Sequence, residues 1–207
     1  LGHTNYAGAD TLRITVDDQG NTGTGGALSD TGTVPITVAP VNDAPVLTVP
    51  GAQTVNEDSP LSITGISVAD LDAASGAIRM TVSAAHGRIT LAQTAGLTFA
   101  AGDGTSDTTM TFTGTLASVN AALARLDYQG NANYNGSDAL TVSVDDQGNT
   151  GAGGAKADSR SIGITVTAVN DAPQLTVPDA QTVNEDTLLS ITGISLSDLD
   201  AGGDSVQ

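Results

Sequence analysis

Short segments in which apolar and polar residues alternate recur along most of the chain. The alternation is clearest at 61–68, 78–82, 139–144 and 161–166. A period of two places the apolar side chains on one face of a β-strand, so these segments are predicted to be half-buried strands. Turn residues separate them at regular intervals, and this spacing predicts an all-β fold built as a β-sandwich. Shorter strands are expected at 46–49, 52–55, 88–91, 97–99 and 110–113.

One segment departs from this pattern. Between residues 115 and 126 the apolar residues Leu116, Val119, Leu123 and Leu126 follow helical spacing and share one face. This spacing predicts a short crossover helix that packs on the sandwich. A helix that binds a partner would show the same spacing, but packing on the core is the favoured interpretation.

A long internal repeat is the second pattern. Residues 41–45 (VNDAP) recur at 169–173, an offset of 169 − 41 = 128. The same offset relates 17–23 (DDQGNTG) to 145–151. A repeat of this length predicts an array of domains in which each contacts mainly its neighbours. We call 41–45 the upstream seam and 169–173 the downstream seam, since both contain proline and are predicted to be linkers.

The repeat divides the chain into three parts. Residues 1–40 match 129–168 at 21 of 40 positions, and 169–207 match 41–79 at 27 of 39 positions. The expected parts are the C-terminal part of a preceding repeat (1–40), a complete repeat (41–168, linker 41–45) and the N-terminal part of a following repeat (169–207). An excerpt from a longer array and a subunit completed by neighbouring molecules both agree with this division.

Composition narrows the choice of function. The formal net charge is −17, from 23 acidic and 6 basic residues. Phosphate backbones need basic neutralisation, so nucleic acid is excluded as an expected partner, and so are anionic membrane surfaces. The chain has no cysteine, hence no disulfides, and its sequence contains no apolar run long enough to span a membrane. An extracellular location is compatible with all of these features.

The acidic residues concentrate at repeated positions. The only two glutamates, Glu57 and Glu185, occupy one repeat position, because 185 − 57 = 128. Carboxylates, asparagine side chains and backbone carbonyls are the oxygen ligands that Ca²⁺ takes. Four or five carboxylates at one seam would push the adjoining domains apart, since two of them about 4 Å apart repel by roughly 4 kcal/mol near a protein surface. The repeated acids therefore predict Ca²⁺ sites that cross-link adjoining domains.

The expected strand directions decide which ligands converge. A strand at 61–68 that ends near the linker brings the aspartates after it to the upstream seam, and a strand at 139–144 runs the same way. Segment 56–58 lies at the opposite end, near the downstream seam. The upstream candidates are Asn42, Asp43, Asp70, Asp72, Asp145 and Asp146, and the downstream candidates are Glu57, Asp58, Asn170, Asp171, Asp198 and Asp200. Glu185 and Asp17 are candidates by repeat equivalence, and the secondary candidates are Asn135, Asp138, Asp103 and Asp107.

Solvated turns are the alternative for these residues, because Asp and Asn also cap turns and adopt left-handed conformations. At the seams the calcium interpretation is favoured. For Asp103 and Asp107, in a Gly-rich loop, the two interpretations are balanced. Segment 145–149 lacks the spacing of an EF-hand and its distal bidentate glutamate, so no EF-hand is predicted.

These same motifs carry a resemblance. Four motifs of this chain resemble those of cadherin repeats. They are Asn-Glu-Asp after the first strand, Asp-Leu-Asp after the second, Asp-Asp-x-Gly late in the unit and Val-Asn-Asp-Ala-Pro at the seam. They are most similar to the bacterial cadherin-like repeats of very long RTX-type surface adhesins. The resemblance implies tandem Ig-like β-sandwich domains, stiffened by calcium, that project a ligand-binding tip from the cell. It also implies seam-ligand roles for Asn42, Asp43, Asp70, Asp72, Asp145, Glu57, Asn170, Asp171, Asp198 and Asp200.

Three kinds of function are candidates, and a fourth, catalysis, is not predicted. A structural extender of a bacterial surface adhesin or extracellular fibre, active in adhesion and biofilms, is the leading prediction, with adjacent repeats or subunits as partners. A calcium-dependent glycan- or protein-binding module would use loop 103–107, but aromatic platforms for sugars are nearly absent. Strand exchange between molecules could build a fibre. No enzyme is predicted, since the two histidines, His3 and His86, are not repeat equivalents.

Overall fold

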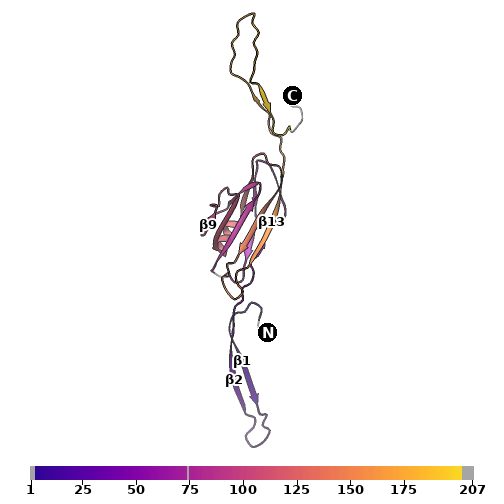
Figure 1. Ribbon diagram of the computed structural model, residues 1–207. Coiled ribbons are helices and arrows are strands. Elements are labelled where there is room, and N and C mark those ends of the chain that lie inside the picture. The colour runs from indigo at the N-terminus through magenta and orange to yellow at the C-terminus, as the bar shows by residue number, and fades with distance from the viewer. Residues whose placement is uncertain (1–2, 74, 202–207) are drawn as a thin grey trace.

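The computed structural model describes residues 3–73 and 75–201. Figure 1 shows an elongated molecule in which a central β-sandwich has one thin β-hairpin at each end. The strands before the central unit are β1 (Gly8–Asp17) and β2 (Ser29–Val38), and those after it are β14 (Gln174–Thr176) and β15 (Ser195–Ser197). The central unit comprises β3 (Val46–Thr48), β4 (Gln53–Asn56), β5 (Pro60–Ile63), β6 (Ser67–Ala69), β7 (Ala77–Ala84), β8 (Gly87–Leu91), β9 (Leu97–Ala101), β10 (Thr109–Thr115), α1 (Leu116–Leu123), β11 (Leu126–Gly130), β12 (Gly136–Asp145) and β13 (Ala157–Thr167).

Two main sheets form the central unit. One has six strands in the order β4-β13-β12-β7-β10-β9, and the other has three in the order β5-β11-β8. Their neighbours are antiparallel except for β4, which runs parallel to β13. A separate pair joins β3 to β6. The predicted all-β sandwich with one short helix is confirmed, and no helix in the described part of the chain could cross a membrane.

One continuous core lies between these layers. Side chains of β7, β10, β12 and β13 alternate between buried and exposed, as a period of two requires. The largest buried side chains are Tyr128 and Phe112, and most of the others are aliphatic. The helix α1 begins with Thr115 as its N-cap and buries Val119, Ala122 and Leu123. The predicted helix therefore packs on the sandwich.

Two details of the predicted elements were wrong. The expected strand at 61–68 is divided into β5 and β6, which belong to different sheets. Gly65 lies between them at φ +84°, a left-handed conformation that favours glycine and turns the chain. The helix ends at Leu123, and Leu126 is instead the first residue of β11, a strand that the sequence did not reveal. Its alternation is too short to distinguish from the end of a helical pattern.

The N-terminal hairpin presents apolar side chains to solvent. Leu12 is 51% exposed, whereas its repeat equivalent Leu140 (140 − 128 = 12) is completely buried. Ile14, Val16, Val34 and Ile36 are exposed in the same way. In the central unit, β12 is covered on its outer edge by β7 and β13 by β4, and no described residue covers the corresponding edges of β1 and β2.

Packing of β8 on β11 generates a testable prediction. A Cβ on Gly87 would lie 2.2 Å from Cε2 of the buried Tyr128 ring. Gly87→Ala is therefore expected to lower the free energy of unfolding by about 2–3 kcal/mol, the range for overpacked cores. Gly163→Ala is the matched control, because its Cβ would meet only the Cβ of Ala52 at 4.0 Å. Urea unfolding measures both, and equal stabilities of the two variants would contradict the packing described here.

Candidate metal sites at the two seams

The upstream seam brings three aspartates together. The backbone N–H of Asp43 donates to Oδ2 of Asp72. The carboxylate Oδ1 of Asp70 accepts hydrogen bonds from the backbone N–H groups of Asp72, at 2.8 Å, and Ala73, at 2.9 Å. The other oxygen of Asp70, Oδ2, is buried and has no hydrogen-bond partner. The linker and the turn after β6 are therefore interlocked, and one carboxylate oxygen remains unused.

Asn42 joins the same seam to the loop between β12 and β13. Its side chain is 1% exposed, and its Nδ2 donates to Oδ2 of Asp146 at 2.7 Å and to the carbonyl of Gly154 at 2.9 Å. Its Oδ1 is buried without a partner. An unpartnered buried oxygen costs free energy unless another group satisfies it. This is the second free oxygen at the upstream seam.

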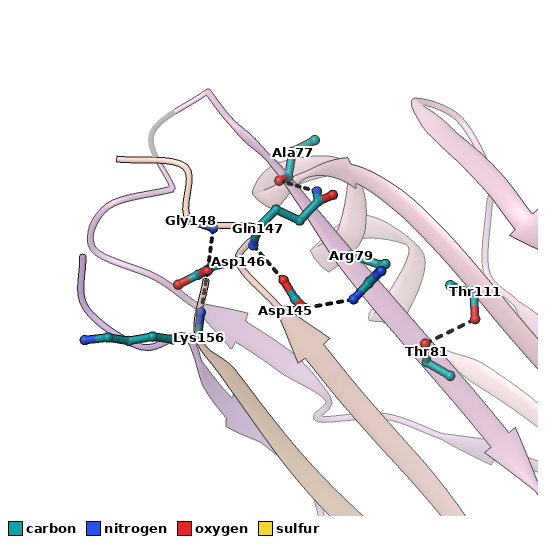
Figure 2. Close-up of polar contacts among 9 residues, drawn as sticks. All are labelled: Ala77, Arg79, Thr81, Thr111, Asp145, Asp146, Gln147, Gly148 and Lys156. Atoms are coloured by element: carbon teal, nitrogen blue, oxygen red, sulfur yellow. Dashed lines mark hydrogen bonds and ion pairs between the residues drawn. The ribbon is translucent and has the colours of Figure 1, made fainter. Parts of the chain in front are cut away.

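Asp146 organises the loop around this contact. Its Oδ1 accepts from the backbone N–H of Gly148 at 2.7 Å and of Lys156 at 2.8 Å, as Figure 2 shows. Burial by itself would raise the pKa of Asp146, but these hydrogen bonds, the amide of Asn42 and the charge of Lys156 together lower it. Asp146 is thus held as a carboxylate by donors of the protein itself.

The downstream seam repeats the upstream geometry. The backbone N–H of Asp171 donates to Oδ2 of Asp200, and the N–H of Asp200 donates to Oδ1 of Asp198 at 3.0 Å. These are the contacts of Asp43, Asp72 and Asp70 shifted by 128 residues. Oδ2 of Asp171 is buried without a partner.

The central unit contributes a glutamate to the downstream seam. Glu57 is 3% exposed, and its Oε1 accepts from the backbone N–H of Val169 at 2.7 Å. Its Oε2 accepts from Nδ2 of Asn135 at 3.4 Å, so this secondary candidate also lies here. The neighbouring Asp58 has φ +59° and accepts from the N–H of Asn133 at 3.2 Å. Candidate ligands from both sides of the linker are therefore adjacent.

The pKa of Asp171 reports this crowding. It is raised above its ordinary value, first by burial and then by the negative charges of Asp200, Asp58, Glu57 and Asp198. Five carboxylates thus act on one another at the downstream seam. A raised pKa means that each proton or cation taken up at this position relieves repulsion.

A cavity adjoins each seam. The upstream cavity of about 250 Å³ is lined by residues that include Ala7, Val41 and Asp72. The downstream cavity of about 410 Å³ is lined by residues that include their repeat equivalents Asn135, Val169 and Asp200. Open space therefore recurs beside the carboxylates at both seams.

Two predicted ligands lie elsewhere. Asp145 points to the outer face of the six-stranded sheet, where its Oδ2 pairs with the guanidinium of Arg79 at 2.8 Å (Figure 2). Its Oδ1 accepts from the N–H of Gln147 at 2.7 Å, so both of its oxygens are engaged by groups outside the seam contacts described above. The equivalent Asp17 makes the same turn contact with Gln19 and belongs to neither described seam. The two residues of the Asp-Asp pair point in different directions, and the sequence alone did not separate them.

Turn and core contacts account for most of the remaining candidates. Asp138 accepts four hydrogen bonds, from the N–H groups of Ala85, His86 and Ala139 and from the hydroxyl of Tyr128, and these donors use both of its oxygens. Oδ2 of Asp107 accepts from the N–H groups of Asp103 and Gly104, which closes the Gly-rich loop. Turn contacts therefore involve Asp103 and Asp107, and core contacts involve Asp138. Glu185 is exposed in a turn of the C-terminal hairpin, and Asn170 donates to the carbonyl of Asp171.

The donor set suits calcium, but it is not preassembled. Asn42, Asp70 and Asp171 each have a buried oxygen without a hydrogen-bond partner, and oxygen is the ligand atom that Ca²⁺ prefers. However, within 3–73 and 75–201 no three acidic or histidine side chains already stand in the geometry of a metal site. Asp72 and Asp200 are turned toward backbone N–H groups instead. The residues present fit the ion in kind, and binding would require these carboxylates to reorient.

Comparison with family models and curated proteins assigns no family to the chain. A family model described as "Protein GAMETE EXPRESSED 2 domain" matches residues 62–152, less than half of the chain. No curated protein matches the sequence.

Solved structures similar to the chain include cadherin repeats. Extracellular cadherin domains 1–5 of protocadherin gamma B2 are 18% identical over 79% of this chain and 27% of that one, with a TM-score of 0.42. Mouse cadherin-23 EC22–24 is 19% identical over 91% of this chain and 53% of that one, with a TM-score of 0.40. This chain therefore spans about a quarter and about half of these two structures. A TM-score below 0.5 supports no finer conclusion, so the fold assignment rests on the sheets themselves.

The protonation state of Asp146 generates a prediction for the upstream seam. Asp146→Asn is expected to lower the free energy of unfolding of the central unit by about 2 kcal/mol at pH 7, since buried donors lose their charged acceptor. A lowered pKa stabilises the fold above the ordinary value of 3.8, and this stabilisation is lost as pH falls through the folded-state pKa. The difference in free energy of unfolding between the variant and the parent chain should therefore become smaller below pH 3.8. Urea unfolding at several pH values measures it, and a gap that widens on acidification would contradict the assignment.

Proposed function

We propose that the chain is an extender segment of an extracellular adhesin or fibre, in which Ca²⁺ at the seams holds successive β-sandwich domains in line. The observation that carries this proposal is the recurrence, 128 residues apart, of one interlocked set of carboxylates, each set with an unused buried oxygen. Segments that connect domains as solvated turns have no need to bury such oxygens. Adjacent repeats are the partners that this arrangement implies.

Electrostatics explains why a cation would stiffen the array. At the downstream seam, Glu57 and Asp58 belong to the central unit, while Asp171, Asp198 and Asp200 belong to the following segment. Their mutual repulsion pushes the two parts away from each other, and a divalent cation between them reverses the sign of this interaction. Since the ligands come from both sides of the linker, the bound ion would restrict bending between the domains.

The setting of the array is part of the proposal. A bacterial cell surface, an RTX-type adhesin and a role in biofilms rest on the motif resemblance alone. The matched family model carries the name of a gamete-expressed protein, which offers a second setting for a similar domain. A structural role rather than catalysis is proposed in either setting.

A fibre assembled by strand exchange is the second candidate. The exposed apolar row on β1 and β2 favours it, because the equivalent side chains of β12 and β13 are buried. Ile14→Asp should then abolish concentration-dependent assembly of the 207-residue chain without changing the melting of the central unit. Light scattering coupled to size exclusion measures assembly, and a chain that stays monomeric at every concentration rejects this candidate.

Calcium dependence tests the leading proposal. For the 207-residue chain, millimolar Ca²⁺ is expected to raise the melting temperature of the central unit by about 5–10 °C over the value in chelator. This range follows from roughly 2.7 kcal/mol per site at 100 times the dissociation constant. The radius of gyration from small-angle scattering should increase as the seams straighten. Unchanged melting and unchanged scattering on chelation would reject the proposal.

Variants assign the effect to the seams. Asp70→Asn is expected to remove most of the gain in melting temperature, while Asp171→Asn should mainly reduce the change in the radius of gyration. Asp103→Asn is the matched control, since this carboxylate serves its own loop by accepting from the N–H of Thr105 at 2.9 Å. A control variant that lost the calcium response as strongly as the seam variants would move the site to the Gly-rich loop.

A further inference from the structure

The only lysine of the chain reaches into the upstream seam. Lys156 is the last residue of the loop between β12 and β13, and its Nζ donates to the backbone carbonyl of Asn42 at 2.5 Å. Its own N–H donates to Asp146, so the residue is anchored at both ends. Figure 2 shows the side chain extending from this main-chain anchor, away from the carboxylate of Asp146. A charged donor therefore rests on the peptide that connects the two domains.

The linker is already joined to this loop by main-chain contacts. The N–H of Asn42 donates to the carbonyl of Ala152 at 2.9 Å, and the N–H of Ala152 donates to the carbonyl of Pro40 at 3.0 Å. The loop also lies very close to the linker, because a Cβ on Gly151 would stand 2.6 Å from the nitrogen of Asn42. Lys156 adds a charged hydrogen bond at the edge of this short ladder.

The hydrogen bond from Lys156 to the carbonyl of Asn42 is expected to be stronger than an ordinary surface hydrogen bond. Asn42 and Asp146 are both 1% exposed, and a charged donor is strengthened where water is excluded. Two arginines on the neighbouring strands have partners of their own. Arg79 pairs with Asp145 at 2.8 Å, and Arg160 pairs with Asp158 at 3.2 Å. Lys156 is therefore the positive side chain that the structure directs to the linker.

The lysine at this position occurs in the central repeat and not in the preceding one. The position equivalent to Lys156 in the preceding repeat (156 − 128 = 28) is Leu28, which is 71% exposed. The acids around the loop are conserved between the two copies, since Asp18 and Asp146 make the same contacts to the loop backbone. The cationic side chain is absent from the first copy.

We propose that Lys156 is a positioning residue that acts as a resident cation, holding linker residues 40–42 against the central unit when no divalent metal is bound. Its ammonium group neutralises part of the charge at the upstream seam and fixes the peptide that carries Asn42 and Asp43. The upstream seam therefore keeps its order in chelator. This inference does not rest on the calcium proposal, because it concerns the chain without metal.

Amide hydrogen exchange of the 207-residue chain in chelator tests it. Lys156→Leu, which installs the residue of the preceding repeat, is expected to speed exchange of the Asn42 and Ala152 amides about tenfold, as expected for a lost charged hydrogen bond. The Glu57 amide, which donates to Thr167 at the other end of the unit, should keep its rate and report an intact fold. Unchanged rates at Asn42 and Ala152 would overturn the proposal.

Two further variants separate charge from hydrogen bonding. Lys156→Arg should keep the exchange rates within about twofold of the parent chain, because its guanidinium retains the charge. Lys156→Gln keeps a donor without charge and should exchange as fast as Lys156→Leu. If the glutamine variant protected the linker as well as lysine, the resident-cation role would be wrong. Arg125→Leu is the control for a lost surface cation, since Arg125 pairs with Asp127 on the three-stranded sheet at 3.0 Å.

Discussion

Repulsion among carboxylates at the linkers is the constraint on which the extended arrangement depends. The domains meet end to end through thin linkers, so few apolar contacts are available to fix the angle between them (Figure 1). The same places carry the densest negative charge, and the raised pKa of Asp171 shows that these charges act on one another. In the proposed function, whatever neutralises these charges controls the stiffness of the chain. The structure offers two means: oxygen-rich sites suited to a divalent ion at both seams, and the ammonium group of Lys156 at one of them.

The interior of the central unit serves a different purpose. Its core is built from aliphatic side chains with two large buried aromatic residues, Phe112 and Tyr128. Tyr128 also donates to Asp138. Burial is the main cause that raises the pKa of Tyr128, and this hydrogen bond is the next. The sandwich thus forms one cooperative body without metal ligands in its centre. The aliphatic and aromatic core lies between the sheets, whereas the candidate ligands lie at the two ends of the unit.

The features that follow from hydrophobic periodicity and from the internal repeat could be predicted from the sequence. Alternation identified most strands, helical spacing identified α1, and the 128-residue repeat identified both seams and the acids that adjoin them. The sequence did not reveal the division of 61–68 at Gly65 or the strand β11, because both depend on pairing between distant segments. It also did not separate Asp145 from Asp146, whose adjacent side chains point to opposite sides of the strand. Lys156 was overlooked because it breaks the repeat, although a sole lysine beside repeated acids was a usable signal.

The most direct test is to locate a bound divalent ion by paramagnetic relaxation. Mn²⁺ added in small amounts to the isotopically labelled 207-residue chain should broaden the amide signals around Asp43 and Asp72 and those around Asp171 and Asp200 first. Excess Ca²⁺ should restore all of them by competition. Signals of the Gly-rich loop at 102–107 and of the outer sheet around Asp145 should remain sharp. Broadening centred on that loop, or spread evenly over the acidic surface, would contradict the claim that the seams hold the ion.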